Sequence, residues 1–328
     1  MIQSIDIIGA GPAGSAAAIA AVEGCTVQLF EKSRLPRHKV CGEFLSPEVA
    51  GVLKSVGVWD DFERLGPASI RRFSLHAGKR SKHATLPDCA YGLSRYEFDR
   101  LLLEKAVALG AVLVRERVGR VPGDRRRVLA CGRRSVAAPG NRLFGLKAHF
   151  RGPTDDSVEL FFFEGCYVGV SCVERSITNV CGIAPETVLR SHGFDMDAVL
   201  GRSRPLADRV RPLVRTMPWL VTGPLVFSGP GADEAGRSVY PAGDALGFTD
   251  PFAGTGILNA LLTGRLAGIA AAHAFSSERY FADCRHALSR AFRVHSLVRG
   301  TIAAGWAEFL MPLVPASWLF RLTRPALL

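Results

Sequence analysis

The sequence predicts an α/β protein: a doubly wound, Rossmann-like domain, an antiparallel β-sheet inserted into it, and a helical C-terminal tail. Three observations predict this arrangement. Residues 4–31 follow the order strand, glycine-rich turn, helix and strand, which opens a doubly wound parallel sheet. Residues 70–91 and 143–184 alternate apolar and polar side chains in short runs between turn residues, as antiparallel strands do. Residues 275–328 are rich in Arg and read as helical, with a solvated basic face.

The first strand–turn–helix unit also predicts a bound dinucleotide. Gly9, Gly11 and Gly14 stand in the order Gly-x-Gly-x-x-Gly, and Glu31 ends the second strand about 20 residues later. The first glycine allows a tight turn, the second lets a pyrophosphate approach the backbone, and the third lets the helix pack closely on the strand. The acid can accept hydrogen bonds from an adenosine ribose. The alternative is a structural turn that holds no ligand.

The later elements predict a discontinuous domain. A helix from Tyr96 to Leu109 and a strand at residues 112–115 return the chain to the parallel sheet, and the chain returns again from Val239. We therefore expect a nucleotide-binding domain made of residues 1–69, 92–142 and 236–274. Residues 70–91 and 143–235 would form a substrate-binding domain, and residues 275–328 a helical C-terminal segment.

Composition excludes several classes of protein. The chain has 328 residues, of which 48% are hydrophobic, so it can bury a substantial core and is not disordered. The net charge of +11 comes without a helix-turn-helix, zinc or stacking pattern, so we expect no nucleic-acid partner. Its 8 Cys include no CxxC pair, and we expect no metal site. No secretory signal opens the chain, so we expect a cytoplasmic protein.

The basic C-terminal segment, residues 275–328, has two open interpretations. Its basic face is either exposed to solvent or in contact with the inner face of a membrane.

A second glycine-rich motif identifies the dinucleotide. Residues 240–245 read Tyr-Pro-Ala-Gly-Asp-Ala, and residues 250–259 read Asp-Pro-Phe-Ala-Gly-Thr-Gly-Ile-Leu-Asn before an apolar helix. Residues 95–99 read Arg-Tyr-Glu-Phe-Asp, and residues 41–43 read Cys-Gly-Glu. Together these motifs resemble the FAD-binding signature of the flavoprotein monooxygenase and geranylgeranyl reductase superfamily. The resemblance covers residues 4–45, 92–135 and 165–270.

The resemblance implies FAD as the cofactor and NAD(P)H as its transient reductant. In this superfamily the Asp of the Gly-Asp pair binds the ribityl chain, and the second glycine turn presents backbone N–H groups to the flavin. The expected cofactor-binding residues are Gly9, Gly11, Pro12, Ala13, Gly14, Glu31, Lys32, Arg37, Lys39, Cys41, Gly42, Arg95, Asp244, Pro251, Gly254, Thr255 and Gly256.

Cys41 is the candidate catalytic residue, because the resemblance places it along the isoalloxazine ring. There its thiol could donate a proton, attach covalently to the flavin or contact the substrate. The alternative is a small packing residue. Phe161 and Phe163 share one face of a strand, and we expect them to form an apolar substrate pocket with Tyr167 and Phe252.

Departures from the family pattern reduce the number of reaction types that the resemblance allows. Cys131 replaces the Asp of an Asp-Gly motif that is linked to FAD and NAD(P)H, and Leu246 stands where hydroxylases carry His. No Trp-x-Trp-x-Ile-Pro segment is present, which disfavours a halogenase. We expect a monooxygenase that acts on a hydrophobic or aromatic small molecule, such as a polyketide-like metabolite. The alternatives are a C=C reductase of a lipid or isoprenoid, and a flavin-binding partner protein without turnover.

Overall fold

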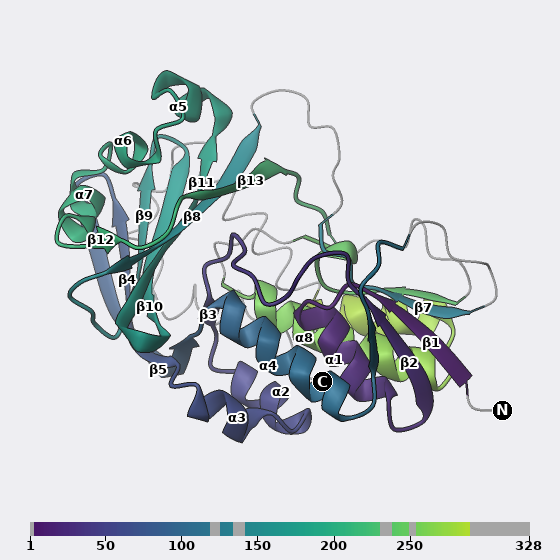
Figure 1. The fold of residues 1–328 in the computed structure, drawn as a ribbon. Coiled ribbons are helices and arrows are strands. Elements are labelled where there is room, and N and C mark those ends of the chain that lie inside the picture. Colours follow the sequence, from purple (N-terminus) through teal and green to yellow (C-terminus); the bar gives the residue numbers. More distant parts are fainter. Residues whose placement is uncertain (1–2, 119–124, 134–141, 230–237, 249–253, 289–328) are drawn as a thin grey trace.

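The computed structural model describes residues 3–118, 125–133, 142–229, 238–248 and 254–288. Within these residues the chain forms one parallel and one antiparallel sheet, which lie in different parts of the molecule (Figure 1). The α/β fold with a Rossmann-like domain and a separate antiparallel sheet is therefore confirmed. No helix among the described residues is both long and apolar enough to span a bilayer.

The parallel sheet has five described strands in the order β14-β7-β1-β2-β6. Each neighbouring pair is parallel, as expected for strands joined by crossover helices. In chain order the strands are β1 (Gln3–Ile8), β2 (Cys25–Phe30), β6 (Val112–Val114), β7 (Arg126–Leu129) and β14 (Val239–Pro241).

Helices pack on this sheet through small and apolar side chains. Ile5, Ile7 and Leu29 are completely buried beneath them. Helix α8 crosses α1 at Gly264 and Gly268, which approach the backbone of α1. The N-termini of both helices therefore lie at the same edge of the sheet (Figure 1). The described helices of this domain are α1 (Pro12–Ala21), α2 (Val49–Ser55), α3 (Trp59–Arg64), α4 (Arg95–Ala108) and α8 (Gly256–Ala272).

The antiparallel sheet has the order β12-β8-β11-β10-β9-β4-β5-β3, and β13 also pairs with β8. The neighbours β4 and β9 are an exception, because they run parallel. The strands are β3 (Phe44–Leu45), β4 (Ala68–Ala77), β5 (Arg80–Gly92), β8 (Leu143–Arg151), β9 (Ser157–Phe163), β10 (Cys166–Val173), β11 (Ile177–Pro185), β12 (Val214–Arg215) and β13 (Leu220–Leu225).

The two faces of the antiparallel sheet have different neighbours. Short helices α5 (Glu186–Ser191), α6 (Met196–Leu200) and α7 (Arg204–Val210) lie on its outer side (Figure 1). Leu200 and Leu206 from these helices pack on outward-facing strand residues. The opposite, inner face is turned toward the domain that holds the parallel sheet (Figure 1).

The chain after α8 is helical again at residues 277–288. Tyr280 from this helix is buried, and its hydroxyl donates to the carbonyl of Pro241 at 2.6 Å, which ties the helix to β14. Residues 289–328, which hold most of the basic C-terminal segment, lie outside the described residues.

Candidate functional site

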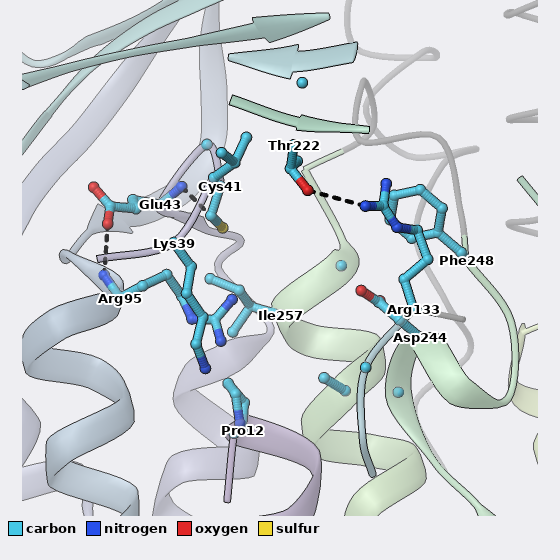
Figure 2. A pocket seen from close by; sticks show the side chains of 18 of the residues that line it. Pro12, Lys39, Cys41, Glu43, Arg95, Arg133, Thr222, Asp244, Phe248 and Ile257 are labelled. Atoms are coloured by element: carbon cyan, nitrogen blue, oxygen red, sulfur yellow. Dashed lines mark hydrogen bonds between the residues drawn. The ribbon is translucent and has the colours of Figure 1, made fainter. Parts of the chain in front are cut away.

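A cavity of about 920 Å³ lies between the carboxyl ends of the parallel strands and the inner face of the antiparallel sheet (Figure 2). Ile8, Phe30 and Ala130 line it where strands β1, β2 and β7 end, and Leu160 and Cys181 line it from the sheet. Ligands of open α/β sheets bind at the carboxyl ends of the strands, so this is where a dinucleotide is expected.

Most of the residues that the sequence singled out meet in this cavity. Of the described candidates, Gly14 and Thr255 lie behind its surface. The others line it: Gly9, Gly11, Pro12, Ala13, Glu31, Lys32, Arg37, Lys39, Cys41, Gly42, Arg95, Tyr167, Asp244, Gly254 and Gly256, with Phe161 and Phe163 as exceptions treated below. Pro251 and Phe252 fall outside the described residues.

The three glycines of the first turn serve different purposes. A Cβ on Gly14 would lie 1.7 Å from the carbonyl oxygen of Gly9, so this position must be glycine for the helix to pack. Gly9 has φ of 105°, which favours glycine. Gly11 has φ of −79°, a value that any residue adopts. Its nearest neighbours would be the Lys39 Nζ at 3.7 Å and an Arg95 nitrogen at 3.9 Å. The glycine at position 11 therefore leaves room beside two cations, as a pyrophosphate requires.

An ion-pair network fixes these two cations. Arg95 and Lys39 both bind the buried carboxylate of Asp99, at 2.6 and 2.7 Å. Burial alone would lower the pKa of Arg95, but the Asp99 carboxylate outweighs this effect and raises it. Burial and the neighbouring Arg95 lower the pKa of Lys39. One carboxylate thus holds two cations, which leaves positive charge for a phosphate at the N-terminus of α1.

Two acids that line the cavity, Glu31 and Asp244, fit the sugar parts of FAD. Glu31 accepts hydrogen bonds from the backbone N–H groups of Ala10 and Ser33, at 3.1 and 2.9 Å, so it is held at the glycine turn. Asp244 lines the cavity, and desolvation there raises its pKa. Such a carboxyl group gains from a polyol partner such as the ribityl chain.

The second glycine turn leads into α8. Gly254 has φ of 63°, and a Cβ there would lie 2.8 Å from a ring carbon of Phe44. A Cβ on Gly256 would meet no atom within 4 Å, so this glycine leaves open space at the start of α8. A helix N-terminus beside open space stabilises negative charge, as on the pyrimidine edge of a reduced flavin.

Cys41 lies on the cavity wall (Figure 2). Its sulfur accepts the backbone N–H of Glu43 at 3.4 Å, and the side chain of Asn179 on β11 donates to its carbonyl at 3.1 Å. The segment that carries Cys41 is therefore fixed against the antiparallel sheet. This position is compatible with each of the roles expected for the thiol.

Sequence reasoning missed the charged cluster that fixes this segment. Glu43 is completely buried and binds Lys147 Nζ at 2.5 Å, His149 Nε2 at 2.6 Å and the backbone N–H of Arg95 at 2.6 Å. Burial would raise the pKa of Glu43, but the hydrogen bond from His149 and the charge of Lys147 outweigh it and lower the pKa. The signal in the sequence was two basic residues at alternate positions of a strand whose other residues are mostly apolar.

His38 completes a group that could in principle hold a metal. Its ring and the side chains of Glu43 and His149 offer three ligand atoms within 4.8 Å of one another. The Lys147 ammonium already balances the carboxylate charge, so a cation would have to displace it. Burial, Lys147 and His149 together lower the pKa of His38, which favours a neutral ring.

The cavity wall from the antiparallel sheet differs from the substrate pocket that the sequence predicted. Tyr167 lines the cavity as expected, but the placement of Phe161 and Phe163 in its wall is wrong. Both point to the outer face of the sheet, where Phe161 stacks on His76 with ring centroids 4.5 Å apart. Alternation showed that they share a face but not which one, because both faces of β9 are covered. Leu160, which directly precedes Phe161 on the strand, lines the cavity instead.

Comparisons with known proteins agree with this site. A family described as FAD binding domain matches residues 2–130. Digeranylgeranylglycerophospholipid reductase 2 of Methanopyrus kandleri is 28% identical over 315 residues, which covers 83% of this chain and 77% of that protein. Flavin-dependent halogenase armH3 of Armillaria mellea is 38% identical over 112 residues, covering 32% of this chain and only 22% of the halogenase.

A solved structure gives the same fold over nearly the whole chain. A triple mutant of the flavin-dependent brominase Bmp2 superposes with a TM-score of 0.81 at 19% identity, covering 97% of this chain and 93% of that one. At this identity the likeness concerns the fold alone. The matched domain, the room beside Gly11 and the paired cations all fit FAD. The chain therefore carries an FAD-binding domain at residues 2–130, and it is similar to FAD-dependent reductases and halogenases.

Proposed function

We propose that this protein is a NAD(P)H-driven flavin monooxygenase that acts on a hydrophobic or aromatic small molecule. The observation that carries the proposal is the composition of the cavity wall opposite the FAD-binding turns. The antiparallel sheet contributes mainly apolar and aromatic side chains to it, among them Phe73, Leu160, Tyr167 and Ile183. Such a wall binds an apolar ring and excludes water.

The distribution of acids supports oxygenation over reactions that need an acid–base pair. Among the described residues that line the cavity, the carboxylates are Glu31, Glu43, Glu116 and Asp244. All four belong to segments of the nucleotide-binding domain, and none lies on the antiparallel sheet. The protein would therefore act on the substrate mainly by position and by exclusion of water.

The residues of this chain would hold FAD in one orientation. Gly11, Lys39 and Arg95 would take the pyrophosphate, Glu31 the adenosine ribose and Asp244 the ribityl chain. The N-terminus of α8 at Gly256 would then face the flavin ring, with Cys41 beside it. FAD supplies the acceptance of hydride from NAD(P)H and, once reduced, the reaction with oxygen.

Flavin reduction and product mass test the proposal. Purified holoprotein is mixed anaerobically with NADPH and an alkylphenol, and air is then admitted. The proposal expects loss of the oxidised flavin absorbance, followed by a product that has gained one oxygen atom. A flavin that no nicotinamide donor reduces would refute the reductant, and oxygen uptake that yields only hydrogen peroxide with every aromatic compound tried would refute the substrate class.

Reduction of a C=C bond is the second candidate, and two observations favour it. The match to the Methanopyrus kandleri reductase extends over 83% of this chain, and Cys41 offers a thiol at the cavity wall. The anaerobic step of that experiment, repeated with an isoprenoid alcohol that carries C=C bonds, separates the two reactions. A reductase would give a product that has gained two hydrogen atoms under strictly anaerobic conditions, whereas a monooxygenase would give none.

A further inference from the structure

Arg133 stands apart from the other cations of the cavity. It follows β7, in the segment where Cys131 replaces the expected Asp, and its side chain reaches across to β13 (Figure 2). Lys39 and Arg95 lie at the glycine turn and are paired with Asp99. Arg133, in contrast, contacts the antiparallel sheet through Thr222 on β13.

Two contacts hold the Arg133 guanidinium. One Nη donates to the Thr222 hydroxyl at 3.0 Å, and the guanidinium carbon lies 5.5 Å from the ring centroid of Phe248. Phe248 is itself stacked on Phe227, with centroids 5.2 Å apart and planes inclined by 16°. These contacts orient the group while engaging few of its five N–H donors.

The charge of Arg133 has no partner among the described residues. Among the described residues no ion pair joins Arg133 to a carboxylate, and Asp244 acts on it electrostatically without pairing with it. Partial burial lowers the pKa of Arg133, which reflects a guanidinium that has lost water without gaining an anion. Removing a charge from water is costly unless an opposite charge compensates. The arrangement is therefore incomplete without an anion.

The surroundings of Arg133 indicate what carries that anion. Leu225, Tyr167 and Ile183 form an apolar cluster on which Phe227 and Phe248 pack. A molecule that lies on this cluster would direct one end toward the guanidinium. The cation and the apolar wall thus suit a ligand with an apolar body and one anionic group.

We infer that Arg133, oriented by Thr222 and Phe248, binds a carboxylate of the substrate and makes the protein selective for hydrophobic acids. The inference rests on the proposed function, because it names the substrate class of the same cavity. It assigns Arg133 a binding role toward the substrate, separate from the cations that would serve the pyrophosphate.

A matched pair of probes tests this inference without turnover. Holoprotein is titrated with para-hexylbenzoate and with para-hexylbenzamide, and binding is followed by the change in flavin absorbance. Charge-assisted hydrogen bonds contribute about 1.5–3 kcal/mol, so the acid should bind roughly 10- to 100-fold more tightly than the amide. Arg133→Gln should remove this preference and leave amide binding unchanged, and Arg133→Lys should retain part of it.

Controls separate the outcomes. Arg204→Gln, on α7 at an exposed site of the outer face, removes the same charge and should leave the preference intact. Equal binding of acid and amide, or no binding of either, would overturn the inference. So would an Arg133→Gln variant that needs more NADPH for flavin reduction but binds the acid normally, because the anion would then be a nicotinamide phosphate. None of these results depends on oxygenation, which is tested separately.

Discussion

Glu43 adopts a backbone conformation that residues with side chains rarely adopt, with φ of 53°. Its carboxylate accepts from Lys147, from His149 and from the N-terminus of α4, and these contacts offset the conformational cost of about 1–2 kcal/mol. The three donors come from both domains. One side chain therefore fixes the position of Cys41 and Gly42 relative to both sheets.

Replacement of this carboxylate should be costly. Glu43→Gln leaves the completely buried Lys147 ammonium without a counter-charge, so we expect the free energy of unfolding to fall by about 3–5 kcal/mol. Urea unfolding followed by circular dichroism measures this change. The double variant Glu43→Gln with Lys147→Met removes the unpaired charge and should recover most of the loss. A single variant that loses less than about 1 kcal/mol would contradict a structural role for the pair.

At the scale of elements, glycines determine how closely α1 and α8 approach. A Cβ on Gly268 would lie 2.3 Å from the carbonyl oxygen of Ala17, and one on Gly264 would lie 2.2 Å from that of Ala13. This contact sets both helix N-termini at the cavity edge. The first glycine turn and the second therefore depend on a contact between helices that are far apart in the sequence.

Two glycine substitutions should have opposite effects on stability. Gly268→Ala forces α8 away from α1 and should lower the free energy of unfolding by about 1–3 kcal/mol. Gly51→Ala, in α2 with no atom within 4 Å of the added carbon, should raise it by about 0.5–1 kcal/mol through helix propensity. Thermal unfolding of both variants checks the pair. Equal effects would show that α1 and α8 approach less closely than these distances require.

Local patterns predicted the elements well, and long-range contacts explain what they missed. The glycine turn at residues 9–14 has its own backbone requirements, so its sequence predicts its structure. The strand with Phe161 has two apolar faces, and only the packing of α6 and α7 decides which face is outward. Lys147 meets Glu43 across 104 positions of the chain, and no local pattern encodes such a pair.

At the scale of the whole molecule, buried carboxylates should make stability depend on pH. Burial alone would raise the pKa of Glu43 and of Asp99, but their basic partners outweigh it and lower both. A lowered carboxyl pKa stabilises the fold above the ordinary value of about 4, and this contribution is lost as the pH falls through the folded-state pKa.

The free energy of unfolding should therefore decrease below about pH 4.5. Urea unfolding at a series of pH values measures the decrease. The double variant Glu43→Gln with Lys147→Met lacks one of the two carboxylates and should show a shallower dependence than the parent protein. Parallel curves for the two proteins would contradict the lowered pKa of Glu43.

The most direct test of the whole account is the flavin content of a Gly11→Val variant. The structure leaves open space at Gly11, beside the Lys39 ammonium and the Arg95 guanidinium, so the added side chain should not prevent folding. It should fill the place of the FAD pyrophosphate. Gly24→Val, at an exposed turn with no atom within 4 Å of the added carbon, is the matched control. We predict that the Gly11 variant is purified folded, by circular dichroism, but without FAD, while the control keeps one FAD per chain. A folded Gly11→Val protein with full flavin content would contradict the placement of the cofactor and every assignment that depends on it.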